Sequence, residues 1–124
     1  MTKLPVRTPP EAMQGATLNQ NIISAIEQKR LLQLQYKSYN RIVEPHAYGV
    51  DDNGIAKLRC YQTSGGSKSS SPSDWKLLNV SDILAMQVMD QVFRGHRADY
   101  KINDSVIVRM FAQLPMNGHA DWRG

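Results

Sequence analysis

The middle of the chain has the pattern of a β-hairpin, and this pattern constrains the fold more than any other feature. Residues 41–50 and 55–63 both alternate in the manner of strands. The segment between them, residues 51–54, reads Asp-Asp-Asn-Gly, and Asn and Gly accept the positive φ that a tight turn requires. The sequence therefore predicts two antiparallel strands at its centre, around which the other elements pack.

Three further segments are predicted to be strands: residues 31–37, 75–78 and 83–93. A turn or a single helical turn is expected over residues 79–82, and residues 64–73, rich in Gly and Ser, are expected to form a loop. Alternation places the following apolar side chains on the buried faces of these strands: Leu32, Leu34, Tyr36, Leu84, Met86 and Val88.

Two helices are predicted to flank the strands. A capping-box pattern at Thr17 predicts that the first helix begins there and ends near residue 30. The second helix is predicted to begin at Asn103 or Asp104 and to stop before Pro115. The apolar side chains at helical spacing are Leu18, Ile22, Ile23 and Ile26 in the first helix and Val106, Ile107, Met110, Phe111 and Leu114 in the second.

These elements fit one domain in a chain of 124 residues. Residues 1–16, with three prolines, are predicted to be a flexible arm or a segment that packs on a neighbouring subunit. Residues 17–114 are predicted to form the domain, and residues 115–124 are predicted to form a C-terminal tail. The predicted fold is mainly β with flanking helices: five short antiparallel strands bent into a small barrel, since closure removes exposed edges.

The hairpin also carries polar side chains suited to an anionic ligand with a flat ring. Guanidinium and ammonium groups pair with phosphate or carboxylate, and aromatic rings stack on a base. The alternative is a solvated sheet face whose mixed charges pair across strands. Provided that Pro45 introduces no bulge and the polar faces coincide, alternation predicts one patch formed by Glu44, His46, Tyr48, Lys57, Arg59 and Tyr61.

The motif Arg-x-Val-Glu-Pro at residues 41–45, followed by the Asn-Gly turn, resembles the core of the WYL-domain family. This resemblance implies an SH3-like or Sm-like barrel with a leading helix. It also implies a ligand-sensing module, because several members of that family bind nucleic acid or nucleotide-like effectors. Arg41 and Glu44 match polar positions of the family motif, and the resemblance assigns them to the ligand site.

The chain departs from the family pattern further along. Ala56, Lys57 and Leu58 stand at the positions of the family's Trp-Tyr-Leu triplet, so that only the Leu is retained. Asn79 and Asp82 replace two arginines that the family directs toward anions. The ligand expected from the resemblance must therefore be held chiefly by the hairpin.

Residues 94–101 follow the last long strand and concentrate basic and aromatic groups. Arg97 and Tyr100 are candidates to complete the anion site, with Tyr100 as a stacking surface. The alternative is a solvated connector in which Asp99 and Asp104 offset the basic charge.

Composition bears on the remaining classes of function. The net charge of +4 suits an anionic partner without requiring one. No apolar run approaches the length of a membrane span, so a cytoplasmic location is expected. Cys60 is the only cysteine and is expected to be a reduced, half-buried thiol. No His or Cys pair has metal-ligand spacing, and no cofactor is expected.

The sequence thus favours a non-catalytic, regulatory module that binds an anionic small molecule or single-stranded nucleic acid. The alternative is an oligomer-forming interaction module, assembled as a homo-oligomer or with a regulatory protein partner. A small hydrolase using Glu44 and His46 is a weaker third possibility, because nothing else in the sequence requires acid/base chemistry.

Overall fold

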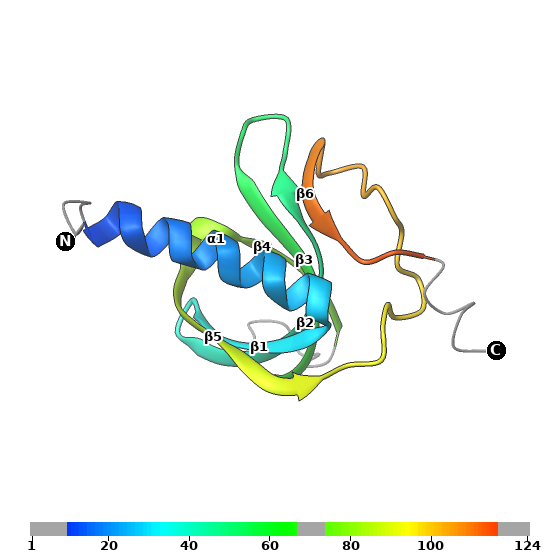
Figure 1. Cartoon of the computed structure of the whole chain (residues 1–124), viewed down its shortest axis with the longest axis horizontal. Coiled ribbons are helices and arrows are strands. Elements are labelled where there is room, and N and C mark those ends of the chain that lie inside the picture. The colour runs from blue at the N-terminus through cyan, green and yellow to red at the C-terminus, as the bar shows by residue number, and fades with distance from the viewer. Residues whose placement is uncertain (1–9, 67–73, 117–124) are drawn as a thin grey trace, which may run out of the picture.

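The computed structural model describes residues 10–66 and 74–116, with side chains from Asn19 onward. In this part of the chain one helix precedes six strands, and a turn of 3-10 helix, η1, joins the fourth strand to the fifth (Figure 1). The elements are α1 (Pro10–Gln28), β1 (Arg30–Tyr36), β2 (Tyr39–Val50), β3 (Ala56–Gly65), β4 (Asp74–Asn79), η1 (Val80–Asp82), β5 (Ile83–Val92) and β6 (Arg109–Gln113).

The strands form one antiparallel sheet in the order β4-β3-β2-β1-β5, with β6 on β2. Strand β2 is its centre: β3 pairs along its whole length, β1 pairs with its first half and β6 with its second half. The predicted mainly β, antiparallel architecture is therefore confirmed. The sheet curls strongly (Figure 1), but no ladder joins β4 to β5 among the described residues, so as paired it is open.

The predicted second helix is wrong. Residues 104–107 form a turn, and the rest of the predicted helix is largely strand β6. Strand β1 ends its pairing with β2 at Val43, so the second half of β2 has an edge open to another strand. The segment around Val106 to Val108 is rich in β-branched residues, which suit that edge better than a helix.

Helix α1 lies across the curled sheet (Figure 1) and buries Ile22, Ala25 and Ile26 against it. It begins at Pro10, not at Thr17, because proline is accepted in the first turn of a helix and the following residues are mostly good helix formers. In the described part of the chain, no helix has the length and apolar character that crossing a membrane takes.

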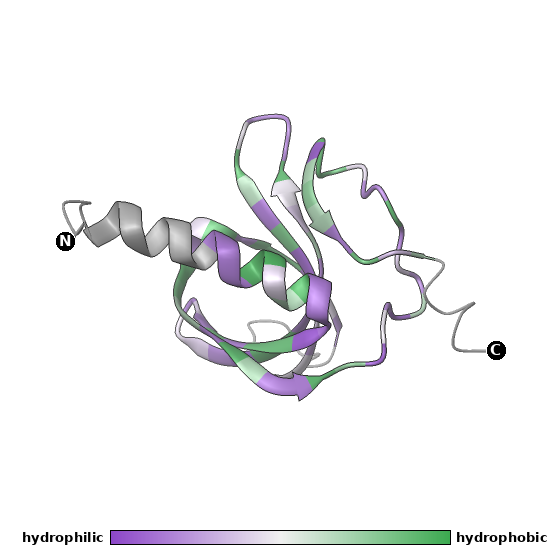
Figure 2. Ribbon diagram, in the orientation of Figure 1, coloured by the Kyte–Doolittle hydropathy of each residue, from purple (hydrophilic) through white to green (hydrophobic). Residues whose placement is uncertain are grey.

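Hydrophilic and hydrophobic residues alternate along the strands (Figure 2), and the inward set forms the core. Leu32, Leu34 and Tyr36 are buried as predicted. Leu84 is 61% exposed, contrary to the prediction, because the register of β1 and β5 shifts between Gln35 and Tyr36. Ile83 is buried in place of Leu84, while Met86 and Val88 are partly buried.

Candidate functional site

A bulge in β2 decides which side of the sheet each polar side chain occupies. Pro45 pairs with Cys60 and Ala47 pairs with Arg59, so His46 is an extra residue in β2. Such a bulge reverses the alternation beyond it. The prediction that Glu44, His46 and Tyr48 share one face is therefore wrong, and Pro45 lies at the start of the irregularity.

Tyr48 and Arg41 both point into the interior. The Tyr48 hydroxyl donates a hydrogen bond to Asn19 of α1, and burial raises the pKa of Tyr48. Arg41 is 5% exposed and lies between the rings of Tyr36 and Tyr39. Its Nη1 donates to Gln62 Oε1 at 3.2 Å, while its Nε has no hydrogen-bond partner in the part of the chain that the structure describes. Neither residue reaches the outer face that carries the remaining candidates.

The side chain of His46 is fully buried and bound at both ring nitrogens. The backbone N–H of Arg97 donates to Nε2 at 3.0 Å, so Nε2 must be unprotonated. The proton is therefore on Nδ1, which donates to the Glu44 carbonyl oxygen at 2.9 Å. Desolvation lowers the pKa of His46 from 6.5 to about 4, so the ring is neutral near pH 7. His46 thus anchors the segment after β5 to the sheet through its hydrogen bond with the Arg97 backbone.

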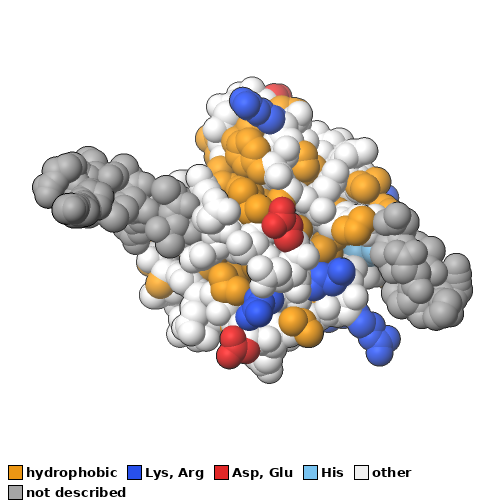
Figure 3. Space-filling view, viewed as in Figure 1, with side chains coloured by type: hydrophobic (Ala, Val, Ile, Leu, Met, Phe, Trp, Pro, Cys, Tyr) orange, Lys and Arg blue, Asp and Glu red, His pale blue; other side chains and the backbone are white. Residues whose placement is uncertain are grey.

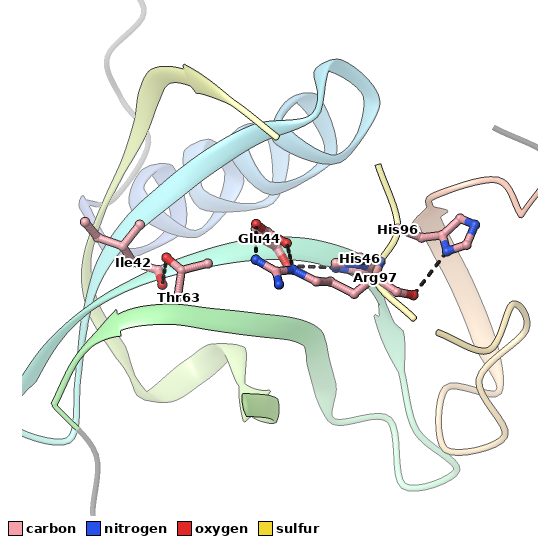
Figure 4. Close-up of polar contacts among 6 residues, drawn as sticks. All are labelled: Ile42, Glu44, His46, Thr63, His96 and Arg97. Atoms are coloured by element: carbon pink, nitrogen blue, oxygen red, sulfur yellow. Dashed lines mark hydrogen bonds and ion pairs between the residues drawn. The ribbon is translucent and has the colours of Figure 1, made fainter. Parts of the chain in front are cut away.

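Glu44, Tyr61 and Arg97 meet on the outer face, as Figure 4 shows for the carboxylate and the guanidinium. Arg97 Nε and Nη2 donate to the two oxygens of Glu44 at 2.8 and 2.9 Å. The guanidinium carbon lies 4.2 Å from the centre of the Tyr61 ring. The hydrogen bonds that Arg97 donates to Glu44 raise the pKa of Arg97. This bidentate ion pair joins residues 53 positions apart in sequence. Together with the hydrogen bond to His46, it holds the segment after β5 against the sheet.

Lys57 and Arg59 share the outer face of β3, as predicted, but both are paired. Lys57 Nζ donates to Asn79 Oδ1 at 2.5 Å and lies 3.9 Å from Asp51. Arg59 Nε donates to Asp104 Oδ2 at 2.7 Å. The charges of the predicted patch are therefore largely satisfied within the protein, chiefly by residues of turns and loops.

A cleft of about 300 Å³ opens between the outer face of β3 and β4 and residues 99–106. Its aromatic walls are Trp75 and Tyr100, and Val106 adds an apolar surface. Both aromatic rings contact the His46 imidazole edge to face, with ring centroids 4.8 and 5.2 Å from the imidazole centroid. The buried bulge residue therefore supports both walls of the cleft without lining it.

The charges around the cleft are balanced. Among the described residues that line it, Arg59 and Lys101 are cationic, and Asp99 and Asp104 are anionic. Lys101 is exposed and has no ion-pair partner in the described part of the chain. On the face shown in Figure 3, Lys and Arg side chains are scattered instead of forming a continuous basic surface. That face therefore has no extended basic surface along which a long polyanion such as a nucleic acid could bind.

The sequence did not predict Trp75 or Asp104 as site residues, and it indicated Lys101 only as part of the basic segment 94–101. Trp75 could have been predicted from its position in the strand that follows the loop after β3. Hairpin pairing of these two strands places Trp75 opposite Tyr61, and their ring centroids lie 5.6 Å apart. Asp104 was expected to offset the charges of residues 94–101, whereas it pairs with Arg59 of β3. Of the nine predicted site residues, Arg59 and Tyr100 line the cleft.

Cys60 is fully buried instead of half-buried. Desolvation raises the pKa of its thiol to about 12, so the sulfur stays protonated and has little nucleophilic character near neutral pH.

No protein-family model matches the chain, and no curated protein or solved structure is similar enough to it to show a relationship. The resemblance to WYL domains therefore rests on the motif at residues 41–45 and the hairpin alone.

Proposed function

We propose that this protein is a non-catalytic binding module whose ligand is a small anion with a flat ring, such as a nucleotide or the end of a nucleic acid single strand. The observation that carries the proposal is the cleft, in which Trp75 and Tyr100 form aromatic walls beside the ammonium group of Lys101, which has no ion-pair partner among the described residues. Aromatic walls stack on a base, and an ammonium group pairs with a phosphate.

The size of the cleft supports a small ligand. Its volume of about 300 Å³ lies at the lower end of the range typical of ligand pockets. That volume suits one ring with one charged group. The state of His46 and Cys60 favours binding over catalysis, since both groups are fully buried and neither is poised to react with a substrate.

The proposal extends to the class of module. The curled antiparallel sheet with a leading helix is consistent with a divergent WYL-type domain of SH3-like or Sm-like form, acting as a cytoplasmic regulatory sensor. The motif at residues 41–45 supports this assignment, although Arg41 is buried and Glu44 is occupied by Arg97.

Replacing Trp75 by Leu is expected to weaken binding of both adenosine monophosphate (AMP) and adenosine by about tenfold, because a stacked base contributes about 1–3 kcal/mol. Lys101→Ala is expected to weaken AMP binding by about threefold, the magnitude of an exposed ion pair, and to leave adenosine unaffected. Isothermal titration calorimetry of each protein with both ligands measures these changes.

Lys37→Ala is the matched control, because Lys37 is an exposed lysine in the turn between β1 and β2, away from the cleft. It removes the same charge and should leave both affinities unchanged. If the unsubstituted protein binds neither AMP, adenosine nor a single-stranded oligothymidylate, the proposed ligand class is wrong. Equal AMP affinities for Trp75→Leu and the unsubstituted protein would show that the cleft is not the site.

A second candidate function, assembly into a homo-oligomer, is favoured by strand β5. Among the described strands β5 pairs only with β1, so its other edge is open. Two large apolar side chains of this strand, Leu84 and Val92, are 61% and 64% exposed. An open edge with apolar groups is a surface on which a second chain can add.

The double substitution Leu84→Glu/Val92→Glu is expected to convert an oligomer into a monomer, because two charges on the open edge oppose close approach of a second copy. Light scattering coupled to size-exclusion chromatography over a range of concentrations measures the mass. A monomeric mass for the unsubstituted protein at every concentration would exclude this assembly.

A further inference from the structure

The carboxylate of Asp104 already occupies the place where a ligand anion would meet Arg59. Both residues line the cleft, and Asp104 Oδ2 accepts a hydrogen bond from Arg59 Nε at 2.7 Å. The pair is partly shielded, with side-chain exposures of 26% for Arg59 and 11% for Asp104. In the described part of the chain, Asp104 is the only ion-pair partner of Arg59.

The position of Asp104 is fixed by its own turn. Its Oδ1 accepts the backbone N–H of Val106 at 3.0 Å, and its carbonyl oxygen accepts that of Ile107 at 3.0 Å. Ile107 is buried and anchors the end of this turn. The carboxylate is therefore held at the cleft by local structure and does not depend on the ion pair for its placement.

We propose that the Asp104 carboxylate competes with an anionic ligand for Arg59, so that the ligand binds this arginine only by breaking its ion pair with Asp104. This inference rests on the proposed function of the cleft and adds a residue that sets its affinity and selectivity. An anion bound next to Arg59 also lies close to the carboxylate of Asp104, and like charges in such proximity are costly. Strongly charged ligands such as phosphates can break the ion pair between Arg59 and Asp104, whereas weak anions cannot.

Asp104→Asn is the substitution that separates charge from structure. The Asn side chain retains an oxygen that can accept the Val106 N–H, so the turn is kept while the negative charge is lost. We expect Asp104→Asn to bind AMP about tenfold more tightly than the unsubstituted protein, because Arg59 becomes available and the repulsion is removed. Adenosine, which has no phosphate, is expected to bind both proteins equally.

Two further variants identify the cause of the gain. Asp99→Asn removes the same charge from the lining of the cleft, but Asp99 does not pair with Arg59, so its gain for AMP should be much smaller. Adding Arg59→Gln to Asp104→Asn should abolish the gain. Calorimetric titration with AMP and adenosine at constant ionic strength is the measurement, and circular dichroism verifies the fold of each variant.

The outcomes separate this inference from the proposed function. If the unsubstituted protein binds AMP and Asp104→Asn binds it equally or less tightly, Asp104 orients Arg59 and does not compete, and the inference is overturned while the cleft remains the site. Equal gains for Asp99→Asn and Asp104→Asn, or a gain that survives the loss of Arg59, would overturn the competition as well. If neither the unsubstituted protein nor Asp104→Asn binds AMP or adenosine, both proposals fail.

Discussion

Acidification from pH 7 to pH 4 is expected to lower the free energy of unfolding by about 3 kcal/mol through His46 alone. In the folded protein, desolvation lowers the pKa of His46 from 6.5 to about 4. Each unit of pH within this window changes the stability by about 1.4 kcal/mol for one group. Urea unfolding at a series of pH values measures the slope.

The sign follows from which state binds the proton. Between pH 6.5 and about 4 the unfolded chain protonates His46, while the folded protein keeps it neutral. Acid therefore stabilises the unfolded state, and stability is lost as the pH falls. Below about pH 4 the folded protein must also protonate Nε2, which then can no longer accept the Arg97 N–H. The pKa values of the Asp51 and Asp104 carboxyl groups are lowered from 3.8, so the stability that these groups contribute is lost mainly at a lower pH than the contribution of His46.

His46→Gln provides the matched comparison, since a Gln oxygen can accept the Arg97 N–H but does not titrate. The variant is expected to be less stable at pH 7, because the Gln side chain fills the space among Trp75, Phe93 and Tyr100 less well than the ring. Between pH 6.5 and 4, its stability should change by about 3 kcal/mol less than that of the unsubstituted protein. The same slope in both proteins would show that His46 is not the group responsible.

The hairpin was predicted correctly because its signals are local. Asn53 and Gly54 specify the turn, Asp51 caps it by accepting the N–H groups of Asn53 and Ile55, and the flanking strands alternate. The bulge at His46 has no comparable local signal beyond Pro45. It depends on contacts made at long range, namely those with Arg97 and the aromatic rings around the imidazole. Alternation therefore assigned Tyr48 to the wrong face.

The prediction of a second helix was wrong for a different reason. Residues 106–114 have apolar side chains at a spacing that fits a helix, yet the segment is also β-branched at three consecutive positions. What decides between the two is the unpaired half of β2, which accepts β6 as a partner. That edge exists only after β1 has ended its own pairing, so the outcome is set by tertiary structure and overrides local propensity.

The cleft could be predicted only in part, because its members come from distant segments. Arg59 was identified from its place on the outward face of its strand, and Tyr100 from its chemistry in the basic segment after the last long strand. The pairing of Arg59 with Asp104, 45 residues away, and of Glu44 with Arg97, 53 residues away, has no sequence signature. These pairs convert an apparently basic surface into a balanced one, which, of the two ligands predicted from the sequence, favours the anionic small molecule over an extended single-stranded nucleic acid.

Gly49→Ala is expected to destabilise the protein by about 3 kcal/mol and to disrupt the pairing of β6 with β2, because it overfills a closely packed site. A methyl group at Gly49 would overlap the Arg109 carbonyl oxygen and lie 2.5 Å from Cγ2 of the buried Ile107. The first of these atoms is backbone of the paired strand and cannot move alone. Because Ile107 anchors the turn that carries Asp104 and Val106, the substitution should also displace one side of the cleft.

Gly54→Ala is the matched control for this effect. Gly54 has a φ of 79°, but a methyl group there would meet nothing within 4 Å. Its cost is therefore limited to the left-handed backbone conformation, about 1 kcal/mol, and it should leave ligand binding unchanged. Urea unfolding gives the two stabilities, and amide hydrogen exchange at Val108, whose N–H donates to the Val50 carbonyl oxygen at 2.9 Å, reports on the attachment of the segment before β6. Retained protection at Val108 in Gly49→Ala, with a stability loss no larger than that of Gly54→Ala, would mean that β6 does not hold the cleft wall against β2.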